Sequence, residues 1–234
     1  MRLLLFSLLL LFSSIPTQAQ WLTRPRVLNN ENFDKAFLSW GYYIGGNSFD
    51  YNFDYNLEQT DVQVQRDAGF NVGLLGNLRL SEYIDLRTEP GLVFAQRTLF
   101  YAPDPRFNND ADQIRDVPAT YIYLPLILKF NTKRLNNTRP FVTIGIATAR
   151  NLSSNEDNPD DNSAGQFRTD ANPSFYEIGF GVDFYLPYFK FTPSIKGIFG
   201  ISDELVRDDI PNSPWTENID KLTSRGFFLN FTFQ

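Results

Sequence analysis

Residues 175–186, with the sequence FYEIGFGVDFYL, alternate between two kinds of side chain. Every second position is apolar: Tyr176, Ile178, Phe180, Val182, Phe184 and Leu186. The positions between them carry mainly acids and glycines, among them Glu177 and Asp183. A period of two is typical of a β-strand whose two faces meet different surroundings. This stretch therefore predicts a strand with one continuous apolar face.

Seven further segments show the same period. They cover 37–45, 69–80, 84–97, 120–131, 139–149, 189–201 and the end of the chain after residue 221. Each has about the 9–11 residues, or slightly more, with which a tilted strand crosses a bilayer. Pro90, Pro125 and Pro193 fall inside three of these segments, where proline removes a bond of the strand ladder. We expect bulges or local gaps at these prolines.

The connections between the segments alternate in length. Long, Asn/Asp/Pro-rich connections cover 46–68, 98–119, 150–174 and 202–221, and short ones cover 81–83, 132–138 and 187–188. Outer-membrane barrels combine long extracellular loops with short periplasmic turns. The sequence therefore predicts an all-β protein, an eight-stranded antiparallel transmembrane β-barrel with long extracellular loops and short periplasmic turns.

The polar faces of the segments carry charges of both signs, and Arg97 and Lys190 are among them. An eight-stranded lumen is narrow and filled by side chains, so these charges can pair inside apolar, lipid-facing walls. The predicted lumen charge network consists of Arg79, Asp85, Arg87, Glu89, Lys129, Glu177, Asp183 and Lys196. The alternative is a soluble barrel of lipocalin type, which would place the charges in water and its apolar face inside.

The N-terminus predicts export. Met1-Arg2 precedes an apolar run over 3–12, and a small residue, Ala19, ends the segment. This pattern is typical of a cleaved signal peptide at 1–19, and the run is too short to span a bilayer as a helix. We expect a periplasmic N-terminal segment at 20–36, the barrel at 37–234, and an integral location in the outer membrane.

Composition excludes several kinds of chemistry. The 234 residues include no Cys and no His and carry a formal net charge of −6. The usual zinc ligands, Cys nucleophiles and Ser-His-Asp triads are therefore absent, and an acidic chain is a poor ligand for nucleic acid. We expect no cofactor, no nucleic-acid partner and no enzyme activity. Carboxylate pairs, Asp85/Glu89 or Glu177/Asp183, leave hydrolysis as a weaker alternative.

Two loops hold the candidate contacts with partner proteins. The proposed contact residues are Asn155, Glu156, Asp157, Asp160, Asp161 and Trp215. The same acidic stretch has oxygen ligands for calcium but lacks the EF-hand spacing. A girdle at the membrane interfaces is predicted from Trp21, Trp40, Trp215, Tyr42, Tyr121, Tyr185 and Tyr188.

Specific strings in strands and loops resemble the PorT family, also called SprT, of outer-membrane proteins tied to the type IX secretion system. The strings are EPGL at 89–92, YLPL at 123–126, KFNTKR at 129–134, NLSSN at 151–155, NPDDN at 158–162, PYFKF at 187–191, PSI at 193–195, DEL at 203–205, NSPWT at 212–216 and GFFLNFTF at 226–233. They span most of the chain from about residue 70 onward.

The resemblance implies a barrel that helps to assemble or operate this secretion machinery, which exports cargo proteins and, in gliding bacteria, surface adhesins. Its implied partners are outer-membrane lipid and other type IX secretion components. The resemblance brings no catalytic residues with it. Two alternatives stay open from the residues alone: a small-solute pore lined by the mixed charges, and a soluble ligand-binding barrel.

Overall fold

The computed structural model describes residues 27–57, 62–107, 110–156, 158, 165, 167–208 and 213–234. The regular secondary structure of the described chain is almost entirely strand, with two short 3-10 helices, η1 (Phe33–Lys35) and η2 (Asp110–Gln113). The strands are β1 (Leu38–Tyr55), β2 (Gln63–Arg66), β3 (Ala68–Arg79), β4 (Ile84–Thr88), β5 (Gly91–Phe100), β6 (Ile114–Asn131), β7 (Thr138–Asn151), β8 (Ser174–Tyr185), β9 (Lys190–Gly200) and β10 (Ile219–Phe233). None of the described helices is long and apolar enough to cross a membrane.

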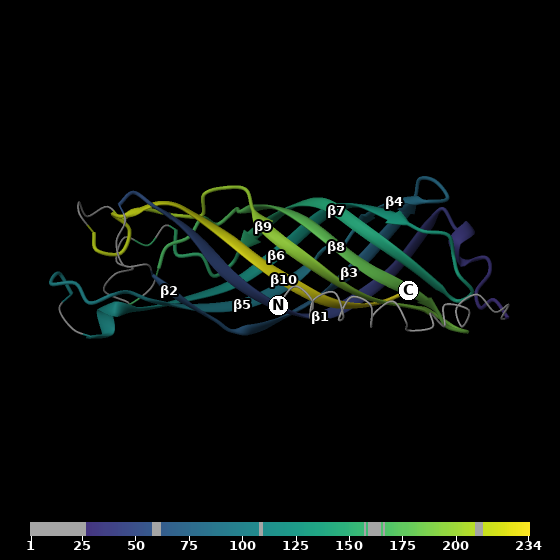
Figure 1. The fold of residues 1–234 in the computed structure, drawn as a ribbon, viewed down its shortest axis with the longest axis horizontal. Coiled ribbons are helices and arrows are strands. Elements are labelled where there is room, and N and C mark those ends of the chain that lie inside the picture. The colour runs from purple at the N-terminus through teal and green to yellow at the C-terminus, as the bar shows by residue number, and fades with distance from the viewer. Residues whose placement is uncertain are drawn as a thin grey trace, which may run out of the picture.

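These elements form one closed ring of eight antiparallel strands (Figure 1). β4 and β5 are two halves of one strand, because both pair with β3 on one side and with β6 on the other. β2 and β3 are likewise two parts of one strand, because β2 directly precedes β3 and both pair with β5. The pairing of β1 with β10 closes the ring. The prediction of an eight-stranded antiparallel barrel is confirmed.

The prolines interrupt the ladders without shifting their register. The pairing of β6 with its neighbour stops at Thr88↔Leu126 and resumes at Gly91↔Tyr123, so Pro90 and Pro125 share one gap. Thr88 Oγ1 donates a hydrogen bond of 2.8 Å to the Pro125 carbonyl there. The β8–β9 ladder has a similar gap opposite Pro193.

Side chains alternate across the barrel wall as the sequence predicts. On β8, Ile178 and Phe180 are 56% and 60% exposed on the outer surface, whereas Glu177 and Asp183 are buried inside. Trp40 and Leu74 belong to the same exposed apolar band on β1 and β3. Charges inside and apolar side chains outside are the arrangement that lipid requires, and the soluble-barrel alternative requires the opposite one.

Several strands extend further than the sequence analysis predicted. β1 continues to Tyr55 and β6 begins at Ile114, although 46–68 and 98–119 were expected to be loops. Beyond the apolar band, toward the end with the longer connections, the two faces of β1 exchange polarity. Tyr51 points inward and is buried, and Asp50 points outward. The prediction failed because it looked for outward apolar residues, whereas a strand standing in water buries its apolar face inside the barrel.

The two ends of the barrel differ, and we call them the loop end and the turn end. Residues 27–37 pack at the turn end against the two short turns after β6 and β8. Asn29 Nδ2 donates to the Tyr185 carbonyl at 3.0 Å, and Arg134 donates to the Asn29 carbonyl. The assignment of 20–36 to the periplasm stays a prediction, and the signal peptide at 1–19 lies outside the described residues.

Candidate functional site

A buried charge cluster lies in the barrel nearest the turn end, and Asp183 is its centre. Asp183 Oδ2 lies 2.6 Å from Lys129 Nζ and 3.7 Å from Lys190 Nζ. Thr192 Oγ1 donates to the other carboxylate oxygen at 2.7 Å. Lys129 also lies 4.0 Å from the centre of the Phe141 ring. β6, β7, β8 and β9 supply these side chains, so the cluster ties four strands together inside the lumen.

A second cluster lies further toward the loop end, where Glu89 enters from the gap between β4 and β5. Glu89 forms ion pairs with Arg87, at 2.6 Å, and with Lys196. Lys196 in turn lies 3.0 Å from Glu177, which accepts a hydrogen bond of 2.8 Å from the Tyr123 hydroxyl. All five residues are buried. Charged groups in such a place require close partners, because removing them from water is costly.

Six of the eight proposed network residues belong to these two clusters. Asp85 is buried beside them and accepts a hydrogen bond of 2.9 Å from Asn131. Arg79 lies opposite Asp85 in the β3–β4 ladder and lines the same small cavity as Asp85 and Asp183 at the turn end. Its guanidinium donates to the backbone carbonyls of Ser81 and Asp34. The place of Arg79 in the charge network stays a prediction.

Aromatic side chains fill the lumen on the loop-end side of the second cluster. The buried group includes Phe49, Tyr121, Tyr123, Phe175 and Phe228 from β1, β6, β8 and β10. The ring centres of Phe49 and Phe228 are 5.5 Å apart, and those of Tyr123 and Phe175 are 6.1 Å apart. Sequence analysis missed this layer, although the inward positions of 120–131 already carried two tyrosines.

Only some of the residues predicted to form the aromatic girdle face outward in the structure. Trp40, Tyr42 and Tyr188 are outward and 69%, 57% and 94% exposed. Tyr121 and Tyr185 instead point inward and are buried, so their assignment to the girdle was wrong. They occupy inward positions of their strands, and aromatic content alone does not reveal this facing. Trp215 lies in a loop, and Trp21 lies outside the described residues.

The side chain of Glu204, in the loop after β9, points into the loop end of the barrel. Glu204 is buried and accepts two hydrogen bonds of 2.8 Å from the backbone N–H and the hydroxyl of Ser224. Burial raises the pKa of Glu204. Just below, Arg97 donates to the same Ser224 hydroxyl and to Tyr121, each at 2.9 Å. The loop after β9 is thereby anchored inside the barrel.

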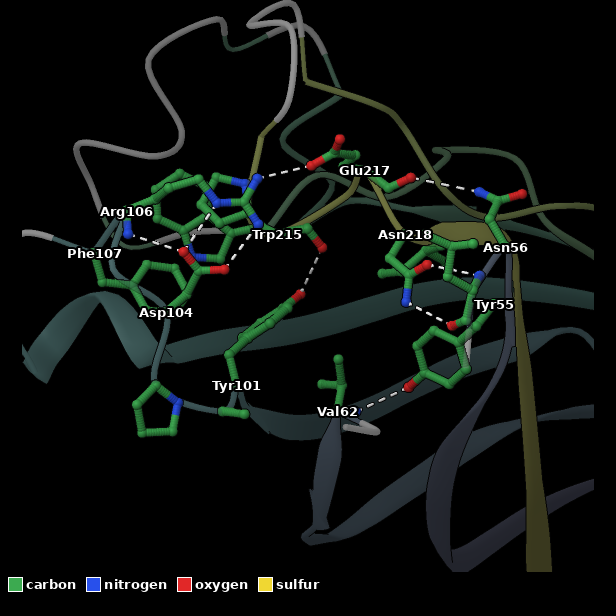
Figure 2. Close-up of a pocket in the computed structure, with 15 residues that line it drawn as sticks. Tyr55, Asn56, Val62, Tyr101, Asp104, Arg106, Phe107, Trp215, Glu217 and Asn218 are labelled. Carbon is green, nitrogen blue, oxygen red and sulfur yellow. Dashed lines mark hydrogen bonds and ion pairs between the residues drawn. The ribbon is translucent and has the colours of Figure 1, made fainter. Parts of the chain in front are cut away.

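The loop end carries a cleft of about 530 Å³, shown in Figure 2. Trp215 forms one wall: its indole N–H donates to the Asp112 carbonyl at 2.9 Å, and the Arg115 guanidinium lies 4.4 Å from its ring centre. Tyr101 donates its hydroxyl to the Trp215 carbonyl at 3.3 Å, and burial raises the pKa of Tyr101. Trp215 therefore joins two loops, as well as facing the cleft.

An exposed ion-pair chain forms the rim of this cleft. Arg106 lies 2.8 Å from Asp104 and 2.7 Å from Glu217. Hydrogen bonds from Arg106 lower the pKa of Asp104 to about 2. The lowered pKa means that the pair is fully formed at neutral pH and is lost only as the pH falls through about 2.

The other proposed contact residues lie in a separate hollow. Asn155 and Glu156 line a cleft of about 540 Å³ beside β7. Glu156 accepts a hydrogen bond of 3.0 Å from the Ala171 N–H, so it fixes the conformation of its own loop. The structure does not bring these two residues together with Trp215 in one site. Asp157, Asp160 and Asp161 lie outside the described residues.

The interior carboxylates serve as counter-charges. Glu89 and Glu177 come together on Lys196, and Asp183 binds Lys129 instead, so neither carboxylate pair considered for hydrolysis is assembled. Within the described part of the chain, no three His, Cys, Asp or Glu side chains are grouped to hold a metal ion. This geometry makes the interior carboxylates part of ion pairs that join strands across the lumen.

A closed barrel with a charged, filled interior and an apolar outer band defines an integral protein of the outer membrane. The family model for the outer membrane protein beta-barrel domain matches residues 18–206. The chain therefore belongs to that family. A search of curated protein sequences gives no significant match.

Solved outer-membrane barrels resemble the chain distantly. Neisserial surface protein A matches with a TM-score of 0.41 and 10% identity over 83% of this chain and 97% of its own. OprG of Pseudomonas aeruginosa gives a TM-score of 0.41 and 13% identity over 84% and 93%. Ail, the attachment invasion locus protein of Yersinia pestis, gives 0.37 and 16% over 83% and 96%.

Proposed function

We propose that this protein is a non-enzymatic accessory barrel of the type IX secretion system, which acts through protein contacts at its loop end. The filled interior carries this proposal. Two ion-pair clusters and an aromatic layer occupy successive levels of the lumen, so the barrel wall offers support and the ends offer contact surfaces. The link to type IX secretion is supported by the loop strings that resemble the PorT family.

The loop end has the features of a contact surface. The cleft beside Trp215 combines aromatic rings with a charged rim, and aromatic residues and Arg are enriched where proteins bind one another. The loops are held in place by Glu204 inside the barrel and by Trp215 between two loops. A surface fixed in advance loses less conformational entropy on binding.

The test is export in a type IX-competent bacterium whose own barrel gene carries a deletion of residues 154–164. We expect folded barrel in the outer membrane, seen as heat-modifiable migration on gels, together with reduced export of cargo. A Tyr188→Ala variant at the opposite end is the control and should export normally. Normal export by the deletion variant would contradict a role for this loop.

The competing small-solute pore is distinguished by planar-bilayer recording of the purified protein. A lumen filled by paired charges and aromatic rings should show no stable single-channel conductance. Stable channels in the parent protein would favour the pore and overturn the proposal of a closed accessory barrel.

A further inference from the structure

The barrel ring opens at the loop end, between β1 and β2. β1 pairs with β3 only as far as Ser48↔Ala68, yet its other edge continues to pair with β10 as far as Tyr55. β2 pairs with β5 and not with β1. Among the described residues, the edge of β1 from Phe49 to Phe53 therefore has no paired strand beside it. We call this opening the seam.

Side chains occupy the places of the missing ladder bonds. The Tyr51 N–H donates to the carboxylate of its neighbour Asp50 at 2.9 Å. The Val62 N–H, on the other side of the seam, donates to the Tyr55 hydroxyl at 2.9 Å. Asp50 and Arg66 form an ion pair of 3.8 Å across the opening. Arg66 is 59% exposed, and ion pairs in such positions contribute little stability.

The seam lies above the apolar band. The outward residues of β1 are Tyr42 and Ile44 within the band, followed by Ser48, Asp50 and Asn52 at the seam. An open strand edge cannot face lipid, because its N–H and C=O groups would have no hydrogen-bond partner there. In water the same edge is a template for another strand. The ring is thus closed where lipid requires closure and open only beyond it.

The seam is also hollow and partly apolar. A depression of about 310 Å³ lies between the two strands and is lined from both sides, with Phe53 on β1 and Val64 on β2. Both side chains are half-buried and pack on the buried apolar cluster of the loop end. A strand entering the seam would therefore find backbone groups of β1 to pair with, and a mainly polar lining that includes Phe53 and Val64.

We propose that the seam binds an extended polypeptide segment of a partner protein, which pairs as an added strand with the free edge of β1. Extended peptides gain affinity from such main-chain hydrogen bonds and specificity from alternate side chains. Neighbouring strands lie about 4.8 Å apart. β2 is joined to β1 only through side chains in the described residues, but a four-residue ladder joins it to β5, so an entering strand has to displace β2 from β5 or move the two together. This inference goes beyond the proposed function and does not depend on the type of secretion system.

A reversible lock tests the proposal. The chain has no Cys, so a disulfide can be introduced without competition. Continuing the Ser48↔Ala68 register by two residues brings Asp50 opposite Arg66. The double variant Asp50→Cys/Arg66→Cys should close the seam when oxidised. The matched control, Ser48→Cys/Ala68→Cys, places the same bond across the last rung that is already paired.

The full-length barrel in detergent micelles is titrated with a fluorescent, reduced and alkylated unfolded polypeptide, and amide hydrogen exchange is followed at Tyr51 and Phe53. We expect the parent protein to bind and these two amides to exchange at least tenfold more slowly. Oxidised Asp50→Cys/Arg66→Cys should bind at least tenfold more weakly and recover when reduced, while the control binds in both states. Undiminished binding by the locked barrel would overturn the proposal. Unchanged amide exchange in the parent protein would also overturn it, and that measurement needs no variant.

Discussion

At the scale of single residues, the interior depends on a few charges that have several partners each. Asp183 neutralises Lys129 of β6 and Lys190 of β9, and Lys196 joins Glu89 to Glu177. In a buried environment the loss of one partner leaves the other charge uncompensated, which costs far more than the pair contributes by itself. These residues therefore govern stability.

We expect Asp183→Ala to lower the free energy of unfolding by about 3–5 kcal/mol, because it leaves two buried ammonium groups without their carboxylate. Denaturant unfolding in detergent micelles measures this loss. Arg106→Ala, which breaks an exposed ion pair at the cleft rim, is the control and should cost less than about 1 kcal/mol. Similar losses in the two variants would contradict the buried network.

At the scale of the strands, one aromatic side chain compensates for the interruption between β4 and β5. Tyr43 lies against the paired glycines Gly73 and Gly91 and donates its hydroxyl to the Glu89 carbonyl at 3.3 Å. A Cβ atom on Gly91 would overlap the Tyr43 hydroxyl and lie 2.6 Å from the Val72 carbonyl oxygen. Glycine is needed here because the ring and the neighbouring strand approach so closely.

Gly91→Ala should therefore destabilise the barrel by about 1–3 kcal/mol, the usual range for overpacking. Gly46→Ala is the matched control, since its added Cβ would meet only the Gly69 carbonyl oxygen, at 3.8 Å. The temperature at which the heat-modifiable band is lost on gels compares the two variants. Equal stability of both would show that Tyr43 does not require this glycine.

At the scale of the whole molecule, the outer surface divides into an apolar band and a polar extension. Phe180 lies midway along the outward face of β8 and is 60% exposed, whereas Gln96 is an exposed outward residue of β5, two residues before Thr98, whose ladder partner is Asp116. The band is the part of the barrel that lipid covers, and the extension stands in water. The boundary between the band and the extension lies where the outward side chains of β1 change from apolar to polar.

Phe180→Arg should cost about 2–4 kcal/mol of stability in lipid bilayers, as expected for a charge near the bilayer midplane. Gln96→Arg introduces the same charge in the extension and should change stability little. Reversible unfolding in liposomes distinguishes the two. If Phe180→Arg were as stable as the parent, the band would not be the lipid-covered surface.

The sequence by itself determined the strand number, the facing of most strands in the band and the mixed charge of the interior, because a period of two is written locally along each strand. It did not reveal the strand extensions, because their apolar side chains turn inward. Only the tertiary structure decided which charges pair: Glu89 meets Lys196 across 107 residues of chain, whereas Arg79 donates to the backbone carbonyls of Ser81 and Asp34. The seam between β1 and β2 likewise depends on where pairing stops, which is a property of two strands together and of neither alone.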